Sequence, residues 1–487
     1  MAWARKKGTP YVDDPVFRAN FLSDFITGLP DRFRDSSIDE MGFSEIERFI
    51  EEEKARKNDP VWRKKLSSQR KSAREKLREQ FGLATIDGRT TPIANWMVEP
   101  AGIFMGRGAH PLRGRWKPRI VPKDVTLNLD EGATIPPGEW GGVVHDQDSM
   151  WIARWVDRLT NKEKYVWLSD ESHLRQQRDR AKYDNAAGLS KHIDQVRELI
   201  RRRLDAENPQ ERTLATVAYL IDKLAMRVGD EKDADEADTV GATTLRVEHI
   251  RFTPEEIRFD FFGKDYVRWE KALLLNQIDP LFHRNLSELT RLKNRGDLIF
   301  TGITSNLVNR FLGRAMPRLT AKVFRTFHAT ESARRYLNEH DRFTPDSSIP
   351  VKLYRARLAN LQAAIHCNHV RTPPKNWEAS LQRKEERLAK AKVDKPKSER
   401  AVARLKERVM KLTLEIDLVR RTKTYNLSTS LRNYIDPRIY KAWSEHVGLD
   451  WQLLYTKALQ RKFAWVNHAR VRWETPSVQL AEPLASV

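Results

Sequence analysis

The chain is long and strongly basic. Its 487 residues exceed one ordinary hydrophobic core and predict two to four domains. A net charge of +21 usually indicates a polyanionic partner, nucleic acid more often than a membrane. The single cysteine, Cys367, excludes an internal disulfide and a cysteine-rich zinc site and indicates a reducing, intracellular compartment. Because no run of about twenty apolar residues occurs and the opening MAWARKKGTP has no apolar signal core, we expect neither a membrane span nor export.

The first third of the chain changes from helices to strands. Its pattern predicts a helix near 16–29 and a charged helical stretch over 38–80 that is interrupted at an Asn-Asp-Pro triplet. From about 83 to 168, Gly, Pro and Trp mark short strands and turns. Within this region the segment 102–120, GIFMGRGAHPLRGRWKPRI, holds five lysines and arginines. Such a segment can enter a DNA groove or simply cross the surface, and both interpretations stay open.

The middle of the chain returns to helices and then forms a hairpin. Helices are predicted over 171–205 and 211–228, with Arg227 at the C-terminal end of the second. Three strands follow, at 243–252, 257–262 and 265–269. Gly263-Lys264 joins the last two strands and places Lys264 at a hairpin tip. A lysine at a turn is usually solvated, but it can also be inserted into a groove.

Two further helices are predicted over 305–337 and 350–370. Lys322 and Arg325 are three residues apart and therefore share a helix face. His369 closes the next helix, just before a Thr-Pro-Pro sequence that cannot continue it.

The stretch 377–421 predicts an antiparallel helical hairpin that projects from the body. Its second helix has apolar residues at alternating spacings of three and four, which is a coiled-coil seam: Val402, Leu405, Val409, Leu412, Ile416 and Val419. Leu381 and Leu388 offer a shorter partner seam, and the turn lies at 394–397. Helices at 438–449 and 451–468 complete the fold, followed by a loose tail after Trp473.

The polar stretch 428–440, STSLRNYIDPRIY, presents a tyrosine just before a helix. Asp436 suits the N-cap and Pro437 the first turn of a helix over about 437–447. Apolar residues spaced by four give this helix a face that should dock on a core. Tyr434 then lies on an irregular but firmly held segment with its hydroxyl accessible, which suits a nucleophile. An ordinary surface or core tyrosine is the alternative.

Several motifs, in order along the chain, resemble the type IB DNA topoisomerases of the eukaryotic kind. They are EPAGIFMGRGAHP, KLAMRVGDEKDADEADTVG, LRVEHI, FDFFGKD, LTAKVFRTFHA, CNHVRTPPK, SLRNYIDPRI and FAW. The resemblance runs from about Phe17 to Trp465. It implies a mixed fold, mainly α with small β-sheets: a bilobed DNA clamp with a tyrosine-recombinase-like catalytic lobe and a coiled-coil linker. The expected domains are a cap lobe at 1–172, a catalytic lobe at 173–376, a linker at 377–422 and a C-terminal domain at 423–487.

The resemblance also implies roles for individual residues. Tyr434 would attack a DNA strand to form a 3′-phosphotyrosine, and Lys264 would protonate the departing 5′ oxygen. Arg227, Arg325 and His369 would hold the non-bridging phosphate oxygens. The expected DNA-binding residues are Arg107, Lys164, Asp265, Lys322 and Asn433. Guanidinium groups suit phosphate because they stay charged and bind its oxygens in pairs.

We expect a monomer that acts on double-stranded DNA with no cofactor. No P-loop and no acidic cluster typical of two-metal catalysis occur in the sequence, so the prediction is a reaction without ATP or a required metal. Compared with the family, the basic-acidic tail is absent, the cap looks trimmed before Phe17, the hairpin looks short, and Met105 stands where arginine is frequent. With no clear nuclear-import cluster, a nucleoid location is favoured over a nucleus.

Two alternatives remain. A tyrosine recombinase uses a similar residue set, but its second arginine usually follows a histidine three residues earlier, where this chain has Lys322, and the linker hairpin is foreign to recombinases. A non-catalytic architectural DNA-binding protein that retained the fold would have the same charge, and only activity would distinguish it.

Overall fold

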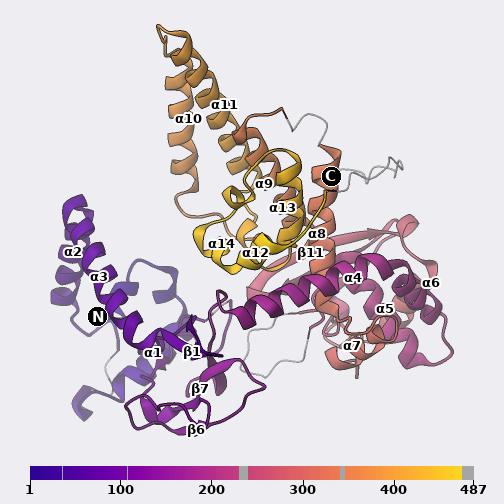
Figure 1. The fold of residues 1–487 in the computed structure, drawn as a ribbon. Coiled ribbons are helices and arrows are strands. Elements are labelled where there is room, and N and C mark those ends of the chain that lie inside the picture. Colours follow the sequence, from indigo (N-terminus) through magenta and orange to yellow (C-terminus); the bar gives the residue numbers. More distant parts are fainter. Residues whose placement is uncertain (34, 36, 107, 230–239, 341–345, 474–487) are drawn as a thin grey trace. The chain divides into compact units, whose positions relative to one another are not determined.

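The computed structural model describes residues 1–487 except 34, 36, 107, 230–239, 341–345 and 474–487. Its described residues form a mixed fold in which helices predominate over four small sheets (Figure 1). They fall into two compact units, Met1–Arg175 and the described residues from Gln176 onward. None of the described helices is long and apolar enough to cross a membrane.

Two of the three α-helices described in the first unit begin at an Asp-Pro pair. The three are α1 (Pro15–Ile26), α2 (Ser44–Asn58) and α3 (Pro60–Phe81). Asp14 and Asp59 cap α1 and α3 by accepting hydrogen bonds from backbone N–H groups of the first turn, and proline follows each. The predicted interruption of the charged helical stretch is therefore confirmed. A small aromatic core of Trp3, Phe17 and Phe21 supports α1.

The rest of the first unit consists of short strands. They are β1 (Leu83–Ile86), β2 (Arg89–Pro92), β3 (Gly102–Ile103), β4 (Trp116–Lys117), β5 (Val125–Asn128), β6 (Gly142–Val144), β7 (Trp151–Asp157) and β8 (Lys162–Trp167). The largest sheet has the order β6-β5-β7-β8. Buried residues alternate along β7, so one face of this sheet packs on a core, as period-two patterning requires.

The basic segment 102–120 is tied into the first unit by ion pairs. Arg113 Nε lies 2.6 Å from Asp14 Oδ2, and Arg115 Nη1 lies 3.0 Å from Asp24 Oδ1. Gly114 adopts φ +93°, and a Cβ there would lie 2.2 Å from the Phe17 carbonyl oxygen, so only glycine fits. Both arginines are thus used within the fold, which favours the surface-crossing interpretation at these two positions.

The second unit is built around long helices and one three-stranded sheet. Its elements up to the hairpin are α4 (His173–Leu204), α5 (Pro209–Leu224), β9 (Ile250–Phe252), β10 (Glu256–Gly263), β11 (Val267–Leu274), α6 (Pro280–Arg291), α7 (Ser305–Gly313), α8 (Ala321–Glu339) and α9 (Ile349–His366). The main core joins α4, α5, α7 and α8 to the inner face of β10, where Ile257 and Phe259 are fully buried. The strand order is β11-β10-β9.

Several predicted boundaries in this unit were wrong. The strand expected over 243–252 is reduced to β9, preceded by a turn and a 3₁₀ helix at Val247–His249. The helix expected over 305–337 is two helices, α7 and α8, with Pro317 in the connection between them. Helices α5 and α9 end earlier than expected, so Arg227 and His369 each lie three residues beyond a helix end.

The C-terminal part contains the predicted hairpin and a cluster of short helices. Helices α10 (Trp377–Val393) and α11 (Glu399–Arg421) pack on each other and extend away from the rest of their unit (Figure 1). Then come α12 (Leu427–Asn433), α13 (Pro437–His446) and α14 (Lys457–Lys462). The helix predicted over 451–468 is wrong, because α14 lies between two 3₁₀ helices, Trp451–Leu454 and Ala464–His468. The expected loose tail lies outside the described residues.

Candidate active site

Three of the predicted catalytic side chains, Arg227, Arg325 and His369, meet around a fourth, Tyr434. The Arg227 Nη1 group donates a hydrogen bond to the Tyr434 hydroxyl oxygen at 3.0 Å. The guanidinium carbon of Arg325 lies 5.0 Å from the centre of the Tyr434 ring, and the His369 ring centre also lies 5.0 Å from it. These residues come from four separate segments of the second unit, so only the tertiary fold brings them together.

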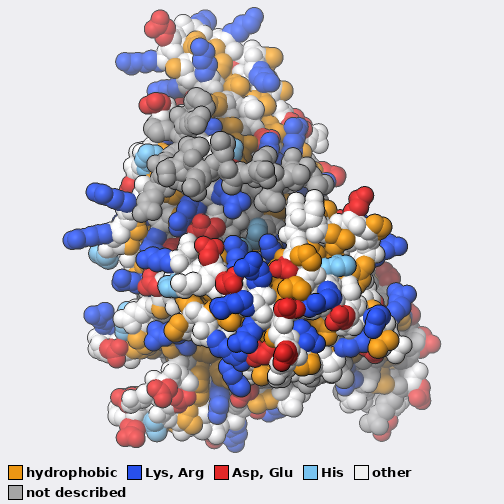
Figure 2. All heavy atoms as spheres, turned by 90° about the vertical axis from the view of Figure 1, so that its right-hand side faces the viewer, with side chains coloured by type: hydrophobic (Ala, Val, Ile, Leu, Met, Phe, Trp, Pro, Cys, Tyr) orange, Lys and Arg blue, Asp and Glu red, His pale blue; other side chains and the backbone are white. Residues whose placement is uncertain are grey.

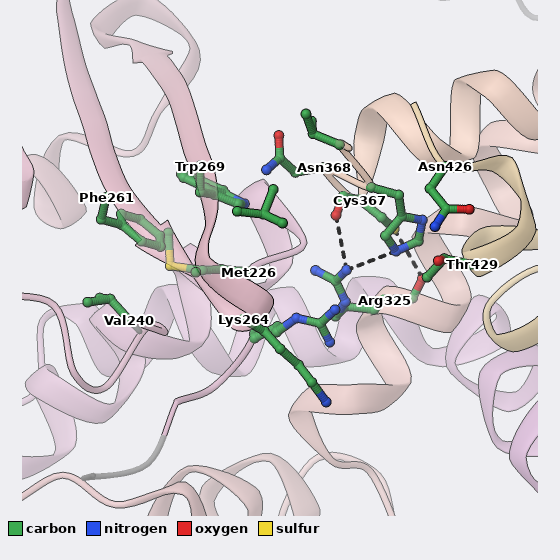
Figure 3. A pocket seen from close by; sticks show the side chains of 15 residues that line it. Met226, Val240, Phe261, Lys264, Trp269, Arg325, Cys367, Asn368, Asn426 and Thr429 are labelled. Atoms are coloured by element: carbon green, nitrogen blue, oxygen red, sulfur yellow. Dashed lines mark hydrogen bonds between the residues drawn. The ribbon is translucent and has the colours of Figure 1, made fainter. Parts of the chain in front are cut away.

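Lys264, the fifth predicted residue, lies on the rim of the same site. It is exposed at the tip of the β10–β11 hairpin, as predicted, and lines a pocket together with Arg227, Arg325 and His369. Figure 3 shows Lys264 on the hairpin and Arg325 on helix α8, both lining this pocket, with the ammonium end of Lys264 directed away from the hydrogen bonds of Arg325. An exposed cation therefore lies on the rim of a site whose other three groups are buried or half-buried.

The backbone of Tyr434 is held on both sides. The stretch 427–433 forms the short helix α12, so the prediction of an irregular approach was wrong, and Tyr434 is its C-cap. Asp436 caps α13 as predicted, and the apolar face of α13 is buried. From α8, the Thr330 hydroxyl donates to the Tyr434 carbonyl at 3.3 Å and accepts from the Asp436 amide at 3.0 Å. The tyrosine is 7% exposed, so its hydroxyl is less accessible than predicted.

Arg325 is buried and fixed by backbone carbonyl groups. Only 4% of it is exposed, and its guanidinium donates to the carbonyls of Ala225 and Cys367, the latter at 3.0 Å (Figure 3). Ala225 has a left-handed backbone with φ +49°, which ends α5 and turns its carbonyl toward the arginine. Lys322, which was predicted to share a helix face with Arg325, is exposed, so these two cations of α8 have opposite environments.

His369 is a neutral imidazole in this setting. Burial, together with the charges of Arg325, Arg227 and Lys271, lowers its pKa to about 3. Its Nε2 lies 3.2 Å from Arg325 Nη2, and because arginine cannot accept a hydrogen bond, Nε2 accepts and the ring proton belongs on Nδ1. Nδ1 is buried without a hydrogen-bond partner among the described residues, as is Arg325 Nε. The site therefore holds donors suited to an additional acceptor.

The Tyr434 phenol is easier to ionise than an ordinary tyrosine. Burial raises its pKa, but the positive charges of Arg325 and Arg227 and the hydrogen bond from Arg227 lower it by more, so the pKa lies below the usual value of 10. No carboxylate or neutral histidine bonds to the hydroxyl in the described part of the chain. The arginines therefore favour the phenolate electrostatically.

The backbone around Arg227 is held by a second segment, and two glycines allow the two backbones to approach closely. Ala242 N–H donates to the Arg227 carbonyl at 2.8 Å, and Thr243 N–H donates to the Val228 carbonyl at 2.7 Å. Gly229 has φ +85°, and a Cβ on Gly241 would lie 2.5 Å from the Gly229 Cα. The strand-like pairing on either side of residues 230–239 therefore requires glycine at this close approach.

The remaining predicted DNA-binding residues are dispersed. Lys164 lies on β8 opposite Trp155 and is half-buried, and Lys322 and Asn433 are exposed. The carbonyl of Asn433 accepts a hydrogen bond from Lys182 Nζ at 3.2 Å. Arg107 lies outside the described residues, and the same holds for the side chain of Asp265.

Sequence reasoning missed two residues close to this site. Thr330 had no motif to mark it, because its role depends on a contact with a segment 104 residues away. Lys271 lies on β11 two residues after the buried Trp269, on the same face of the strand, and this inward position was a usable signal. Lys271 lies beyond the predicted strand, which ended at Trp269, so the prediction did not assign it to a strand face.

Three family models match nearly the whole chain. The model for the DNA binding fragment of eukaryotic DNA topoisomerase I matches residues 1–168, its catalytic core model matches 171–402, and the C-terminal topoisomerase domain model matches 406–475. These matches begin before Phe17 and continue past Trp465, beyond the limits expected from the motifs.

Relatives from plants and animals agree with these models. The chain is 34% identical over 504 residues to DNA topoisomerase 1 alpha of Arabidopsis thaliana, covering 95% of this chain and 54% of the relative. It is 34% identical to DNA topoisomerase 1 of Drosophila melanogaster (96% and 50% covered) and 32% identical to that of Homo sapiens (93% and 64% covered).

The three matched models are all domains of topoisomerases, and the relatives are all named as DNA topoisomerase 1 enzymes. The chain belongs to the eukaryotic DNA topoisomerase I family. It spans between about half and two thirds of the length of these relatives. Neither the recombinase nor the architectural alternative is favoured by these matches.

Proposed function

We propose that this protein relaxes positive and negative DNA supercoils by cutting and rejoining one strand of double-stranded DNA. The observation that carries the proposal is the Tyr434 hydroxyl, hydrogen-bonded to Arg227 and lying against Arg325 and His369. In a chain of this family, that grouping provides a nucleophile beside cations suited to a phosphodiester.

The proposed reaction is a transesterification. The Tyr434 oxygen forms a bond to phosphorus and loses its proton to solvent, while the bond from phosphorus to the 5′ oxygen breaks. Lys264 gives a proton to that oxygen, leaving a 3′-phosphotyrosine and a free 5′ hydroxyl. After the free strand rotates, the 5′ hydroxyl reverses the same steps. Because one phosphodiester replaces another, no nucleotide hydrolysis is needed.

Three side chains are proposed to stabilise charge on phosphorus. Arg227 and Arg325 supply charged, forked donors, and a single preorganised donor of this kind typically contributes about 3 to 4 kcal/mol. His369 is neutral, and it can donate a further hydrogen bond to a phosphate oxygen without a change in its protonation state. In this proposal the fixed cations fulfil the electrostatic role that metal ions have in other phosphoryl transfers, so no divalent metal and no other cofactor is required.

The proposal extends to the whole molecule. We infer a monomeric, bilobed clamp with a cap lobe at 1–172, a catalytic lobe at 173–376, a coiled-coil linker at 377–422 that limits strand rotation, and a C-terminal domain at 423–487. Basic side chains are spread over the face shown in Figure 2, interspersed with acidic ones. DNA affinity should therefore fall steeply with salt, because several phosphates are neutralised on binding. The place of action would be wherever the cell keeps its chromosome, a nucleoid or a nucleus.

Plasmid relaxation tests the proposal. The wild type should relax both negatively and positively supercoiled plasmid in EDTA without ATP, and Tyr434→Phe should bind DNA normally but relax neither. Tyr425→Phe, a half-buried tyrosine nine residues earlier, is the matched control and should retain activity. With a labelled strand, only wild type and control should form a covalent protein–DNA complex through the 3′ phosphate. An active Tyr434→Phe enzyme would contradict the mechanism, and a requirement for paired DNA sites would favour recombination.

A further inference from the structure

Lys271 has no role in the mechanism proposed above, and its ammonium group binds the ends of the two helices that precede Arg227 and His369. Its Nζ donates to the carbonyl of His366 at 2.5 Å and to the carbonyl of Leu224 at 3.3 Å. These are the last residues of helices α9 and α5. The final carbonyls of a helix have no partner within it and carry partial negative charge, so a cation placed between two such ends stabilises both.

Arg325 makes a second bridge between the same two segments, one residue further along each of them. Its guanidinium donates to the carbonyls of Ala225 and Cys367, which directly follow Leu224 and His366. The two helix ends are therefore joined by two cations, Lys271 between one pair of carbonyls and Arg325 between the next pair. Each bridged end leads within two residues to a proposed phosphate-binding side chain, Arg227 after α5 and His369 after α9.

The two bridges differ in what else they must do. Under the proposed function, Arg325 turns donors toward the phosphate and so shares them with the carbonyls that it now binds. Lys271 has a different setting: its ammonium contacts the Trp269 ring, with Nζ 5.5 Å from the ring centre, and both of its hydrogen bonds go to backbone. It can keep the helix ends together while Arg325 engages the substrate.

We propose that Lys271 is a positioning residue that fixes the spacing between Arg227 and His369 during strand cleavage. The proposal rests on the proposed function and deepens it, since Lys271 acts through the two segments that it joins and touches no reacting atom. A neutral side chain of similar length should leave two helix-terminal carbonyls underbonded and let these segments separate.

The protonation of Lys271 supplies a specific signature. Burial lowers its pKa to about 8, with the thiol of Cys367 raising it and the charge of Arg325 lowering it. The other titratable groups around it are His366 and His369, whose pKa values are both lowered to about 3 and which are therefore neutral above pH 6. As pH rises through about 8, the wild type should lose the charged bridge, whereas an arginine at this position would keep its charge.

Single-turnover cleavage of an oligonucleotide duplex tests the proposal. At pH 7 and saturating DNA, Lys271→Met should cleave at least tenfold more slowly than wild type while its Kd for DNA changes less than threefold. Lys271→Arg should recover most of the rate. Lys223→Met, which removes an exposed lysine beside Leu224, is the charge-matched control and should match wild type.

The same rates measured from pH 6.5 to 9.5 separate positioning from mere stability. The advantage of wild type over Lys271→Met should shrink above pH 8, and the ratio of Lys271→Arg to wild type should rise there. Using ratios cancels the titration of Tyr434. Equal cleavage by Lys271→Met and Lys223→Met, or pH-independent ratios for both Lys271 variants, would overturn the proposal. If Lys271→Met fails to fold, the ratio of Lys271→Arg to wild type still decides. Plasmid relaxation by wild type reports on the proposed function separately.

Discussion

Arginine side chains have opposite environments in the candidate site and in the α10–α11 hairpin. Arg325 is 4% exposed, and its donors go to backbone carbonyls and His369. On the hairpin, the Arg420 side chain is 60% exposed and pairs with Glu385 across the two helices at 2.6 Å. Both arginines are paired, but only Arg325 has been removed from water.

This difference in solvation determines what each charge contributes. A buried cation is costly unless its hydrogen bonds are satisfied, so it is held in one orientation and acts strongly on its neighbours, as the lowered pKa values of His369 and Tyr434 illustrate. An exposed pair is screened by water and salt and contributes about 0–1 kcal/mol. The charges of the site are therefore held in one orientation, whereas the charges of the hairpin stay solvated and can reorient.

The exposure of the hydrophobic seam on α11 also differs between the base and the tip of the hairpin. Ile416, near its base, is buried, whereas Val402, near its turn, is 37% exposed. The base is also joined to α9, where the Tyr354 hydroxyl donates to Asp417. Ala391, close to the turn on α10, is nevertheless buried, so packing reaches the tip on that helix while the predicted a/d seam of α11 is only partly a core.

The largest effect is expected at Lys264, an exposed cation. It would be an exception to the rule that buried charges act strongly and exposed charges weakly. Lys264→Ala should slow strand cleavage by about 10²- to 10⁴-fold, since a proposed general acid acts on the reacting atom whatever its burial. The measurement is single-turnover cleavage. A substrate with sulfur in place of the bridging 5′ oxygen should restore the rate, because a thiolate leaves without being protonated. Failure of the sulfur substrate to restore it would exclude the acid role.

Arg325→Lys should sharpen the comparison by keeping the charge and removing the fork. We expect a loss of about 10²- to 10³-fold in cleavage, the usual effect of losing one preorganised donor. The matched variant is Arg335→Lys, at an exposed arginine of the same helix, which should change the rate less than threefold. A cleavage rate near wild type for Arg325→Lys would mean that charge alone suffices at this position.

Thr330→Val tests a buried contact that carries no charge. Loss of the hydroxyl leaves the Tyr434 carbonyl and the Asp436 amide without a partner, at a cost of about 1 to 3 kcal/mol. We expect cleavage to fall by roughly tenfold at saturating DNA for an effect of this size, with little change in Kd. Thr330→Ser should recover the rate. If Thr330→Val melts earlier but cleaves normally, the hydroxyl only stabilises the fold.

The half-buried His366 predicts how the free energy of unfolding depends on pH. The folded pKa of His366 is about 3, lowered by burial and by the neighbouring His328, and lies below the value of about 6.5 expected when unfolded. Between these values the unfolded chain binds more protons, so stability should decline as pH falls from 6.5, by up to about 1.4 kcal/mol per pH unit for this group. His366→Phe should have a shallower decline in urea unfolding between pH 7 and 5. An unchanged slope would show that other groups dominate.

The smallest effect is expected on the hairpin. Arg420→Gln removes the ion pair with Glu385 and should change the free energy of unfolding by less than about 1 kcal/mol, with cleavage chemistry unaffected. Urea unfolding and single-turnover cleavage are the measurements. A tenfold change in cleavage would mean that the hairpin and the site are coupled, and the contrast between the two regions would no longer hold.

The sequence by itself determined most local structure and the family. Asp-Pro pairs located the starts of α3 and α13, and the spacing of apolar residues located the two hairpin helices, because capping and helical period depend on residues only a few positions apart. The motifs likewise indicated which five residues to examine. Helix ends were predicted less well, since α5 ends at a left-handed alanine that no local rule requires.

Only the tertiary structure decided the environment of each charge. Lys322 and Arg325 look equivalent in sequence, yet one is exposed and the other is buried against two helix ends. The bond from Arg227 to Tyr434 spans 207 residues, and the bridging position of Lys271 depends on where α5 and α9 both end. Burial and long-range hydrogen bonding arise from the packing of distant segments, and these are the factors that set pKa values and positions in the site.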